Sequence, residues 1–184
     1  MAVIEVLLVD DQLLFVESLK TVIDTRAEGI HVCGVARTGK EAIESVIRHQ
    51  PDVILMDVRM PVMDGVEATR IIHASYPDIS IMMLTTFDDD AYVVEALNHG
   101  AVGYLLKDIP PSELISAVRA MYDGAIIISP QVAKKLLRAR EASGPGRPEA
   151  PAESGLLRFL SPREIQVMRL ADNLKDYMPP ISRE

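Results

Sequence analysis

The sequence predicts an α/β protein in which five helices cover a doubly wound, five-stranded parallel sheet. Over the first 125 or so residues, short apolar runs alternate with segments of helical periodicity, and this alternation indicates a parallel sheet with helices on its faces. Several runs are apolar at every position, as expected of strands buried on both faces. Capping residues and glycines lie between the segments, where helices begin and end.

The five predicted strands are short apolar runs. They are Glu5–Val9, Ile30–Ala36, Val53–Met56, Ile79–Leu84 and Val102–Leu106. In a doubly wound sheet, functional residues lie at the carboxyl ends of the strands. The residues that follow each run are therefore the candidates for a functional site.

A segment with helical features follows each predicted strand. In four of these segments the spaced residues are Phe15, Leu19, Val22 and Ile23; Ala42, Ile43, Val46 and Ile47; Val66, Thr69, Ile72 and His73; and Leu114, Ile115, Val118 and Tyr122. Residues that favour helix boundaries flank the segments. They are the Thr38–Glu41 capping box, the Asp64-Gly65 turn, Asp88 or Asp89 as the cap of the fourth helix, Gly100 at its end and Gly124 at the end of the fifth.

The composition changes after residue 125. Ser129-Pro130 is predicted to begin a helix that continues to about Arg140, because proline is favoured at the first helical position. A stretch rich in Gly, Pro, Ser and Ala follows, typical of a flexible linker, and helical features return after Leu160. We expect a domain over residues 1–125, a linker helix and flexible linker over 126–158, and an incomplete helical tail over 159–184.

The net charge of −8 is unevenly distributed. Residues 1–133 contain 9 Lys and Arg against 20 Asp and Glu, a net charge of −11, whereas residues 134–184 contain 10 against 7, a net charge of +3. An acidic surface repels phosphates, so the first part is not expected to bind nucleic acid. No apolar run approaches the roughly 20 residues that span a bilayer, and Cys33 is the one cysteine. We therefore expect a cytoplasmic protein with no membrane partner.

Acidic, hydroxyl and basic residues follow four of the predicted strands. Asp10 and Asp11 follow the first strand, Asp57 the third, Thr85 the fourth and Lys107 the fifth. Taken singly, these residues have ordinary interpretations as helix caps, turn residues or a solvated lysine. Because the carboxyl ends of parallel strands meet at one edge of the sheet, we expect all five side chains to converge there.

These residue types indicate phosphoryl chemistry at a magnesium ion. Packed carboxylates repel one another unless a cation lies among them, and Mg²⁺ prefers oxygen ligands. A carboxylate beside the metal, here Asp57, can attack phosphorus and become an acyl phosphate. Lys107 can pair with the phosphoryl charge, and the Thr85 hydroxyl can donate a hydrogen bond to a phosphoryl oxygen.

The sequence from residue 3 to about 124 resembles the receiver domain of bacterial two-component response regulators. The resemblance lies in the motifs Val6–Asp11, Pro51–Pro61, Asp64-Gly65 and Gly100–Asp108, which occur in order. The last motif is similar to that of the NarL/FixJ subfamily. The resemblance implies a flavodoxin-like fold. Many receivers have a proline where this chain has Asp108, so a cis peptide bond is not expected there.

The resemblance also implies how a phosphoryl group is taken up. Asp57 is expected to receive it from a sensor histidine kinase. Mg²⁺ is expected to be bound by Asp11, Asp57 and the main-chain carbonyl of Arg59, with Asp10 assisting. The chain would then be a self-phosphorylating and slowly autodephosphorylating switch, and not a turnover enzyme.

Three further residues are implied in the response to phosphorylation. Lys107 is expected to contact the phosphoryl group, and Thr85 and Tyr104 to form the switch pair. Without the resemblance, Tyr104 is more simply explained as a half-buried packing residue of a strand. Dimerisation through the receiver is a candidate output of the switch.

The segment Phe159–Leu170 resembles the opening helix of a LuxR-type helix-turn-helix domain. Such a domain reads DNA with a second helix in the major groove, and no second helix is predicted before Glu184. We expect a truncated form of a transcription regulator, with DNA binding only in a full-length form. A naturally short variant, or a tail that packs on a partner subunit, are the alternatives.

Two other functions fit part of the pattern. A stand-alone protein–protein switch requires only the receiver, but the segment after Ser161 argues against that origin. A phosphatase of the haloacid-dehalogenase kind also uses a strand-end aspartate and Mg²⁺. It carries a second acid two residues after the nucleophile, where this chain has Arg59.

Overall fold

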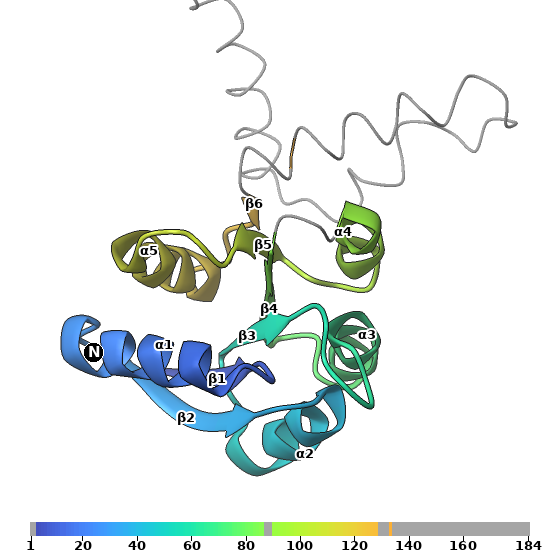
Figure 1. Cartoon of the computed structure of the whole chain (residues 1–184), viewed down its shortest axis with the longest axis horizontal. Helices are drawn as coiled ribbons and strands as arrows, with labels where there is room; N and C mark the ends of the chain where they lie inside the picture. Colours follow the sequence, from blue (N-terminus) through green and yellow to red (C-terminus); the bar gives the residue numbers. More distant parts are fainter. Residues whose placement is uncertain (1–2, 87–89, 129–132, 134–184) are drawn as a thin grey trace, which may run out of the picture. The chain divides into compact units, whose positions relative to one another are not determined.

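A computed structural model of the chain describes residues 3–86, 90–128 and 133 (Figure 1). Its centre is a parallel sheet with the strand order β2-β1-β3-β4-β5-β6. The strands are β1 Ile4–Val9, β2 Ile30–Ala36, β3 Val53–Asp57, β4 Ser80–Thr85, β5 Gly103–Leu106 and β6 Ile127–Ile128. The five predicted strands are confirmed to within one residue at each end. The two-residue strand β6, which pairs with β5, was not among them.

Five helices alternate with the strands and cover both faces of the sheet. They are α1 Leu13–Arg26, α2 Gly39–His49, α3 Gly65–Ser75, α4 Asp90–Asn98 and α5 Pro111–Tyr122. Figure 1 shows α1 and α5 on one face and α2, α3 and α4 on the other. This arrangement is the predicted doubly wound, flavodoxin-like architecture.

The core consists of two apolar clusters, one on each face of the sheet. Side chains of β1, α1 and α5 form the first, and side chains of β1, α2, α3 and α4 form the second. The central strands β3 and β4 contribute to both clusters, because alternate side chains of a strand point to opposite faces. All five residues of β3 are buried, which explains why this run is apolar up to its last residue.

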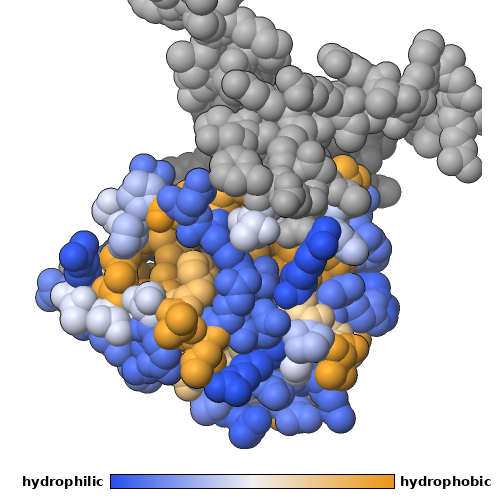
Figure 2. All heavy atoms as spheres, in the orientation of Figure 1, coloured by the Kyte–Doolittle hydropathy of each residue, from blue (hydrophilic) through white to orange (hydrophobic). Residues whose placement is uncertain are grey.

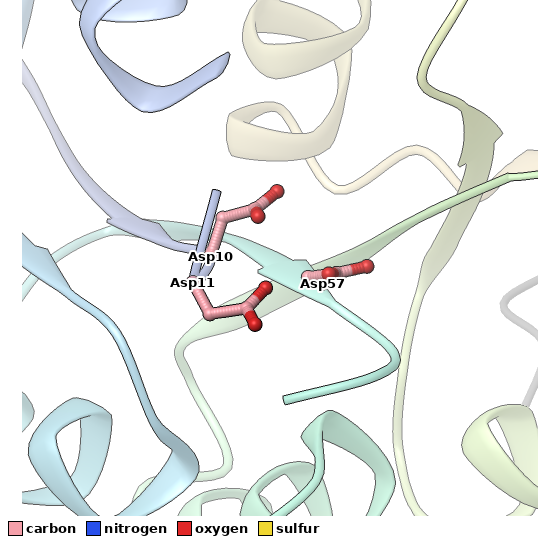
Figure 3. Close-up of side chains that lie close together, drawn as sticks. All are labelled: Asp10, Asp11 and Asp57. Carbon is pink, nitrogen blue, oxygen red and sulfur yellow. The ribbon is translucent and has the colours of Figure 1, made fainter. Parts of the chain in front are cut away.

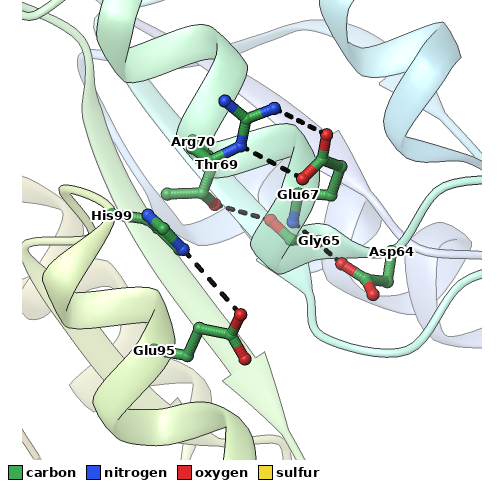
Figure 4. Close-up of polar contacts among 7 residues, drawn as sticks. All are labelled: Asp64, Gly65, Glu67, Thr69, Arg70, Glu95 and His99. Atoms are coloured by element: carbon green, nitrogen blue, oxygen red, sulfur yellow. Dashed lines mark hydrogen bonds and ion pairs between the residues drawn. The ribbon is translucent and has the colours of Figure 1, made fainter.

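The predicted capping box at Thr38 is present, and the predicted Asp64-Gly65 turn also supplies a helix cap. The Thr38 hydroxyl accepts a hydrogen bond from the Glu41 amide (3.1 Å) at the start of α2. The Asp64 carboxylate accepts one from the Glu67 amide (2.8 Å) at the start of α3, as Figure 4 shows. Gly100, with φ +100°, follows the end of α4. The other predicted cap of α4, Asp88 or Asp89, lies outside the described residues.

The surface of the described residues is mainly polar. In the view of Figure 2, apolar side chains interrupt this polar surface in several separate places. Among the described residues, no helix is long and apolar enough to cross a membrane. The predicted linker helix from Ser129 and the predicted tail over 159–184 lie outside the described residues, apart from position 133, so the domain boundaries stay predictions.

Candidate phosphoryl-acceptor site

The register of the sheet brings the ends of β1, β3, β4 and β5 together. Val9 of β1 pairs with Met56 of β3, and the last residue of β3, Asp57, pairs with Leu84 of β4. Thr85, the last residue of β4, pairs with Leu106 of β5. The residues that follow these positions therefore leave the sheet at one edge, as predicted.

Three aspartates form an acidic cluster at this edge. Each of Asp10, Asp11 and Asp57 offers one carboxylate oxygen, and these oxygens lie within 4.8 Å of one another (Figure 3). Asp10 is 3% exposed and Asp57 is 4% exposed, whereas Asp11 is exposed to solvent. The cluster therefore has a closed inner side and an open outer side.

Lys107 lies against the inner side of this cluster. Its Nζ is 2.8 Å from Oδ2 of Asp10 and 2.9 Å from Oδ2 of Asp57. The same Nζ lies 5.1 Å from the centre of the Phe15 ring, within the range of a cation–π contact. From the sequence, Phe15 was predicted only to lie on the apolar face of a helix. Its contact with Lys107 depends on the distance between α1 and the end of β5, which the spacing of residues along the chain does not reveal.

Asp10 is held in place by the backbone that follows it. Its Oδ1 accepts a hydrogen bond from the Gln12 amide (2.9 Å). Gln12 is the N-cap residue of α1 and makes no side-chain capping bond. The aspartate pair therefore does not cap α1 in the usual way, and Asp10 is instead oriented toward Lys107.

The environment of Asp57 disfavours its charged form. The pKa of Asp57 is raised to about 6: burial is the largest cause, the hydrogen bond from Lys107 opposes it, and the neighbouring charge of Asp10 adds to it. Burial lowers the pKa of Lys107, but its bonds to Asp10 and Asp57 outweigh this effect and leave the pKa raised. Lys107 therefore stays charged at neutral pH, and Asp57 is ionised there at a free-energy cost.

This cost gives a testable dependence of stability on pH in the absence of divalent metal. In the folded protein Asp57 is protonated below about pH 6, whereas in the unfolded chain it is protonated only below its ordinary pKa of 3.8. The native state thus holds the extra proton between these values, and its stability falls as pH rises through them. Relative to Asp57→Asn, the wild-type free energy of unfolding is expected to fall by about 2–3 kcal/mol between pH 4 and pH 7. Urea unfolding of both proteins in EDTA measures this difference, and a constant difference would contradict it.

The donor set fits a divalent cation of the magnesium kind. Three carboxylates and one lysine carry a net charge of −2 when all are ionised, which a divalent cation neutralises. Carboxylate oxygens are hard ligands of the type that Mg²⁺ prefers, and the exposed side of the cluster leaves room for water ligands. Among residues 3–86, 90–128 and 133, no other group of three or more His, Cys, Asp or Glu side chains is arranged to hold a metal.

Thr85 and Tyr104 lie on neighbouring strands. Thr85 is buried at the end of β4, and its hydroxyl donates a hydrogen bond to the carbonyl of Thr86 (2.9 Å). Tyr104 is fully buried in the apolar cluster on the face of α2, α3 and α4, and its strand position pairs with Met83. Their joint action as a switch stays a prediction.

The loop between β3 and α3 passes close to the carbonyl of Asp57. The Gly65 amide donates to the Val58 carbonyl (2.9 Å), and the Gly39 amide donates to the Met63 carbonyl (3.0 Å). A Cβ at Gly65 would collide with the carbonyl oxygen of Asp57. The Asp64-Gly65 pair was predicted only as a turn. The structure adds that Gly65, having no Cβ, allows the start of α3 to lie against the end of β3.

Val62 in this loop has an unfavourable backbone conformation. Its φ is +70°, which strains the backbone of a β-branched residue, and its side chain is 89% exposed and contributes little packing. We expect Val62→Gly to increase the free energy of unfolding by about 0.5–1 kcal/mol, because glycine adopts this φ without steric cost. Chemical denaturation measures the change. The matched control, Val94→Gly in the exposed part of α4, is expected to lower stability by a similar amount.

Comparison with known proteins agrees with this geometry. Residues 6–119 match the family of the response regulator receiver domain. The transcriptional regulatory protein LnrK of Bacillus subtilis (strain 168) is 38% identical over 169 residues, covering 90% of this chain and 75% of LnrK. The transcriptional regulatory protein DegU of Brevibacillus brevis is 36% identical over 176 residues, covering 91% of this chain and 74% of DegU.

A solved structure shows the same likeness. A LuxR-family two-component response regulator from Aurantimonas sp. SI85-9A1 superimposes with a TM-score of 0.70 at 30% identity, covering 76% of this chain and 99% of that one. With the receiver match over most of the chain, this protein belongs to the response regulators of two-component systems, whose receiver domains act as phosphorylation-dependent switches.

Proposed function

We propose that Asp57 is the phosphoryl acceptor of this response regulator and that a sensor histidine kinase is the donor. The observation that carries the proposal is that the Asp57 carboxylate lies in one cluster with the carboxylates of Asp10 and Asp11 and is 2.9 Å from Nζ of Lys107. An oxygen of Asp57 forms the new bond to phosphorus. The bond from phosphorus to the kinase imidazole breaks, and the imidazole keeps the electron pair.

The remaining groups of the site have complementary roles. Asp10, Asp11, Asp57 and the main-chain carbonyl of Arg59 would hold Mg²⁺. The bound ion supplies charge neutralisation for the phosphoryl oxygens. Lys107, already charged, pairs with the phosphoryl group once the carboxylate of Asp57 has reacted.

Thr85 and Tyr104 transmit the change in this proposal. A phosphoryl oxygen offers the buried Thr85 hydroxyl a stronger acceptor than the Thr86 carbonyl that it now contacts. A shift of Thr85 would alter the packing beside Tyr104 and bias the face formed by α4, β5 and α5 between two states. Dimerisation through this face or another part of the receiver is a candidate output.

The proposed output is control of transcription, since the relatives LnrK and DegU are transcriptional regulatory proteins. DNA binding is assigned to a helix-turn-helix domain of the LuxR type and not to the receiver, because the receiver itself is acidic. We place the protein in the cytoplasm, where such regulators meet both kinase and DNA. It acts as a switch, and not as a phosphatase with turnover, since position 59 carries an arginine in place of a second acid.

Phosphorylation by a small phosphodonor tests this function. Purified protein is incubated with acetyl phosphate in Mg²⁺ or in EDTA, and its intact mass is recorded over time. We expect one phosphoryl group per chain in Mg²⁺ and a rate at least about tenfold lower in EDTA. Absence of labelling in Mg²⁺, or equal labelling in EDTA, would contradict the proposal.

A further inference from the structure

An arginine of the β3–α3 loop contacts an aromatic ring of α4. The guanidinium carbon of Arg59 lies 5.6 Å from the centre of the Tyr92 ring, within the range of a cation–π contact. Tyr92 is partly buried and packs against the apolar cluster that also contains residues of α2 and α3. The Tyr92 ring is therefore held by its packing against the core, whereas Arg59 is exposed and belongs to a loop.

This contact lies where the loop begins. Asp57 is fixed by its place in β3, which pairs with β4. Val58, next to Arg59, is held by hydrogen bonds of its amide to the Leu84 carbonyl and of its carbonyl to the Gly65 amide, and the far end of the loop is held by the bond from the Gly39 amide to the Met63 carbonyl. Between these points the loop contains a strained residue, Val62. Arg59 is thus tied to the body of the domain by a side chain that reaches across to α4.

We propose that Tyr92 is a positioning residue for the phosphoryl-acceptor site, acting through Arg59. By holding the guanidinium, the ring restricts the backbone of Arg59, whose carbonyl is a ligand in the proposed Mg²⁺ site. The inference rests on the proposed function, because it requires the cation to be bound there. It also makes α4 sensitive to the cation, since a coupling between two parts of a protein is reciprocal.

Magnesium affinity, measured without any phosphodonor, tests this role. Titration of the ¹⁵N-labelled protein with MgCl₂ by NMR gives the dissociation constant for wild type, Tyr92→Phe and Tyr92→Leu. A cation–π contact at an exposed site corresponds to an effect of about two- to fivefold. We expect Tyr92→Leu to weaken Mg²⁺ binding by this factor and Tyr92→Phe, which keeps the ring, to bind as wild type does.

The same substitutions in an Arg59→Met background provide the decisive control. Replacing Arg59 also removes a positive charge near the bound cation, and this removal by itself favours Mg²⁺ binding. The Mg²⁺ affinity of the Arg59→Met variant alone therefore does not report on the contact with Tyr92. In the double-mutant cycle this charge effect cancels. We expect Tyr92→Leu to have no effect on Mg²⁺ affinity when position 59 is methionine.

Three outcomes decide the inference. An equal weakening by Tyr92→Leu in both backgrounds would overturn it, because the ring would then act without Arg59. Unchanged affinity in Tyr92→Leu would also overturn it. If the wild-type protein itself bound no Mg²⁺, the proposed site would fail together with this inference, and that result is distinguishable from the other two. Thermal unfolding of each variant separates a loss of fold from a loss of affinity.

Discussion

Asp57→Asn is expected to lower the rate of phosphorylation by acetyl phosphate at least about a hundredfold relative to wild type. The amide keeps the size and the hydrogen-bonding shape of the side chain, but it is not a nucleophile toward phosphorus. The fold is expected to remain intact, since an uncharged group at this buried position relieves the cost of ionisation. Incubation with acetyl phosphate and Mg²⁺, followed by intact mass, measures the rate.

Two matched substitutions control this experiment. Asp108→Asn makes the same chemical change at an exposed aspartate beside Lys107 and is expected to leave the rate unchanged. Asp11→Asn removes an acid of the cluster but keeps the acceptor, so it is expected to raise the Mg²⁺ concentration that phosphorylation requires. Labelling of Asp57→Asn at the wild-type rate would show that another group is the acceptor.

Lys107→Met is expected to lower the free energy of unfolding by about 3 kcal/mol at pH 7 without divalent metal. The substitution leaves Asp10 and Asp57 buried without the cation that lies 2.8 and 2.9 Å from them, and breaking a buried pair in this way is strongly destabilising. Urea unfolding in EDTA measures the loss. The control Lys20→Met removes an exposed lysine from a pair with Asp24 and is expected to cost about 0.5 kcal/mol or less.

The same variant has a further signature. Mg²⁺ supplies the missing positive charge, so its addition is expected to stabilise Lys107→Met more than it stabilises wild type. Lowering the pH is also expected to narrow the difference between the two proteins, because protonated acids no longer need the lysine. A loss of stability that neither Mg²⁺ nor acid reduces would indicate lost packing against Phe15 as the cause.

The local patterns of the sequence were sufficient for the fold. Val53–Met56 is apolar at each position because β3 is buried on both faces, and its prediction needs no knowledge of neighbouring strands. The Thr38 cap of α2 is likewise a short-range feature that the sequence reveals directly. Strand β6 was missed because two residues are too few to show a periodic pattern. Its pairing with β5 depends on where the chain lies after the end of α5.

The candidate site was predictable to the extent that it follows from strand ends. Asp10, Asp57 and Lys107 converge because parallel strands share one edge, which the order of the motifs already implies. The contacts of Lys107 with Phe15 and of Arg59 with Tyr92 were not predictable, since each joins elements far apart in the sequence. The positive φ of Val62 was also hidden, because valine rarely adopts that conformation.

Chemical mapping of the phosphoryl group tests the central claim most directly. Wild-type protein phosphorylated in Mg²⁺ is treated with borohydride, which reduces an aspartyl phosphate to the corresponding alcohol, and the peptides are sequenced by tandem mass spectrometry. We predict reduction at Asp57 alone, in the peptide that also contains Arg59. Reduction at Asp10 or Asp11, or a phosphoryl group that remains on a residue inert to borohydride, would contradict the account.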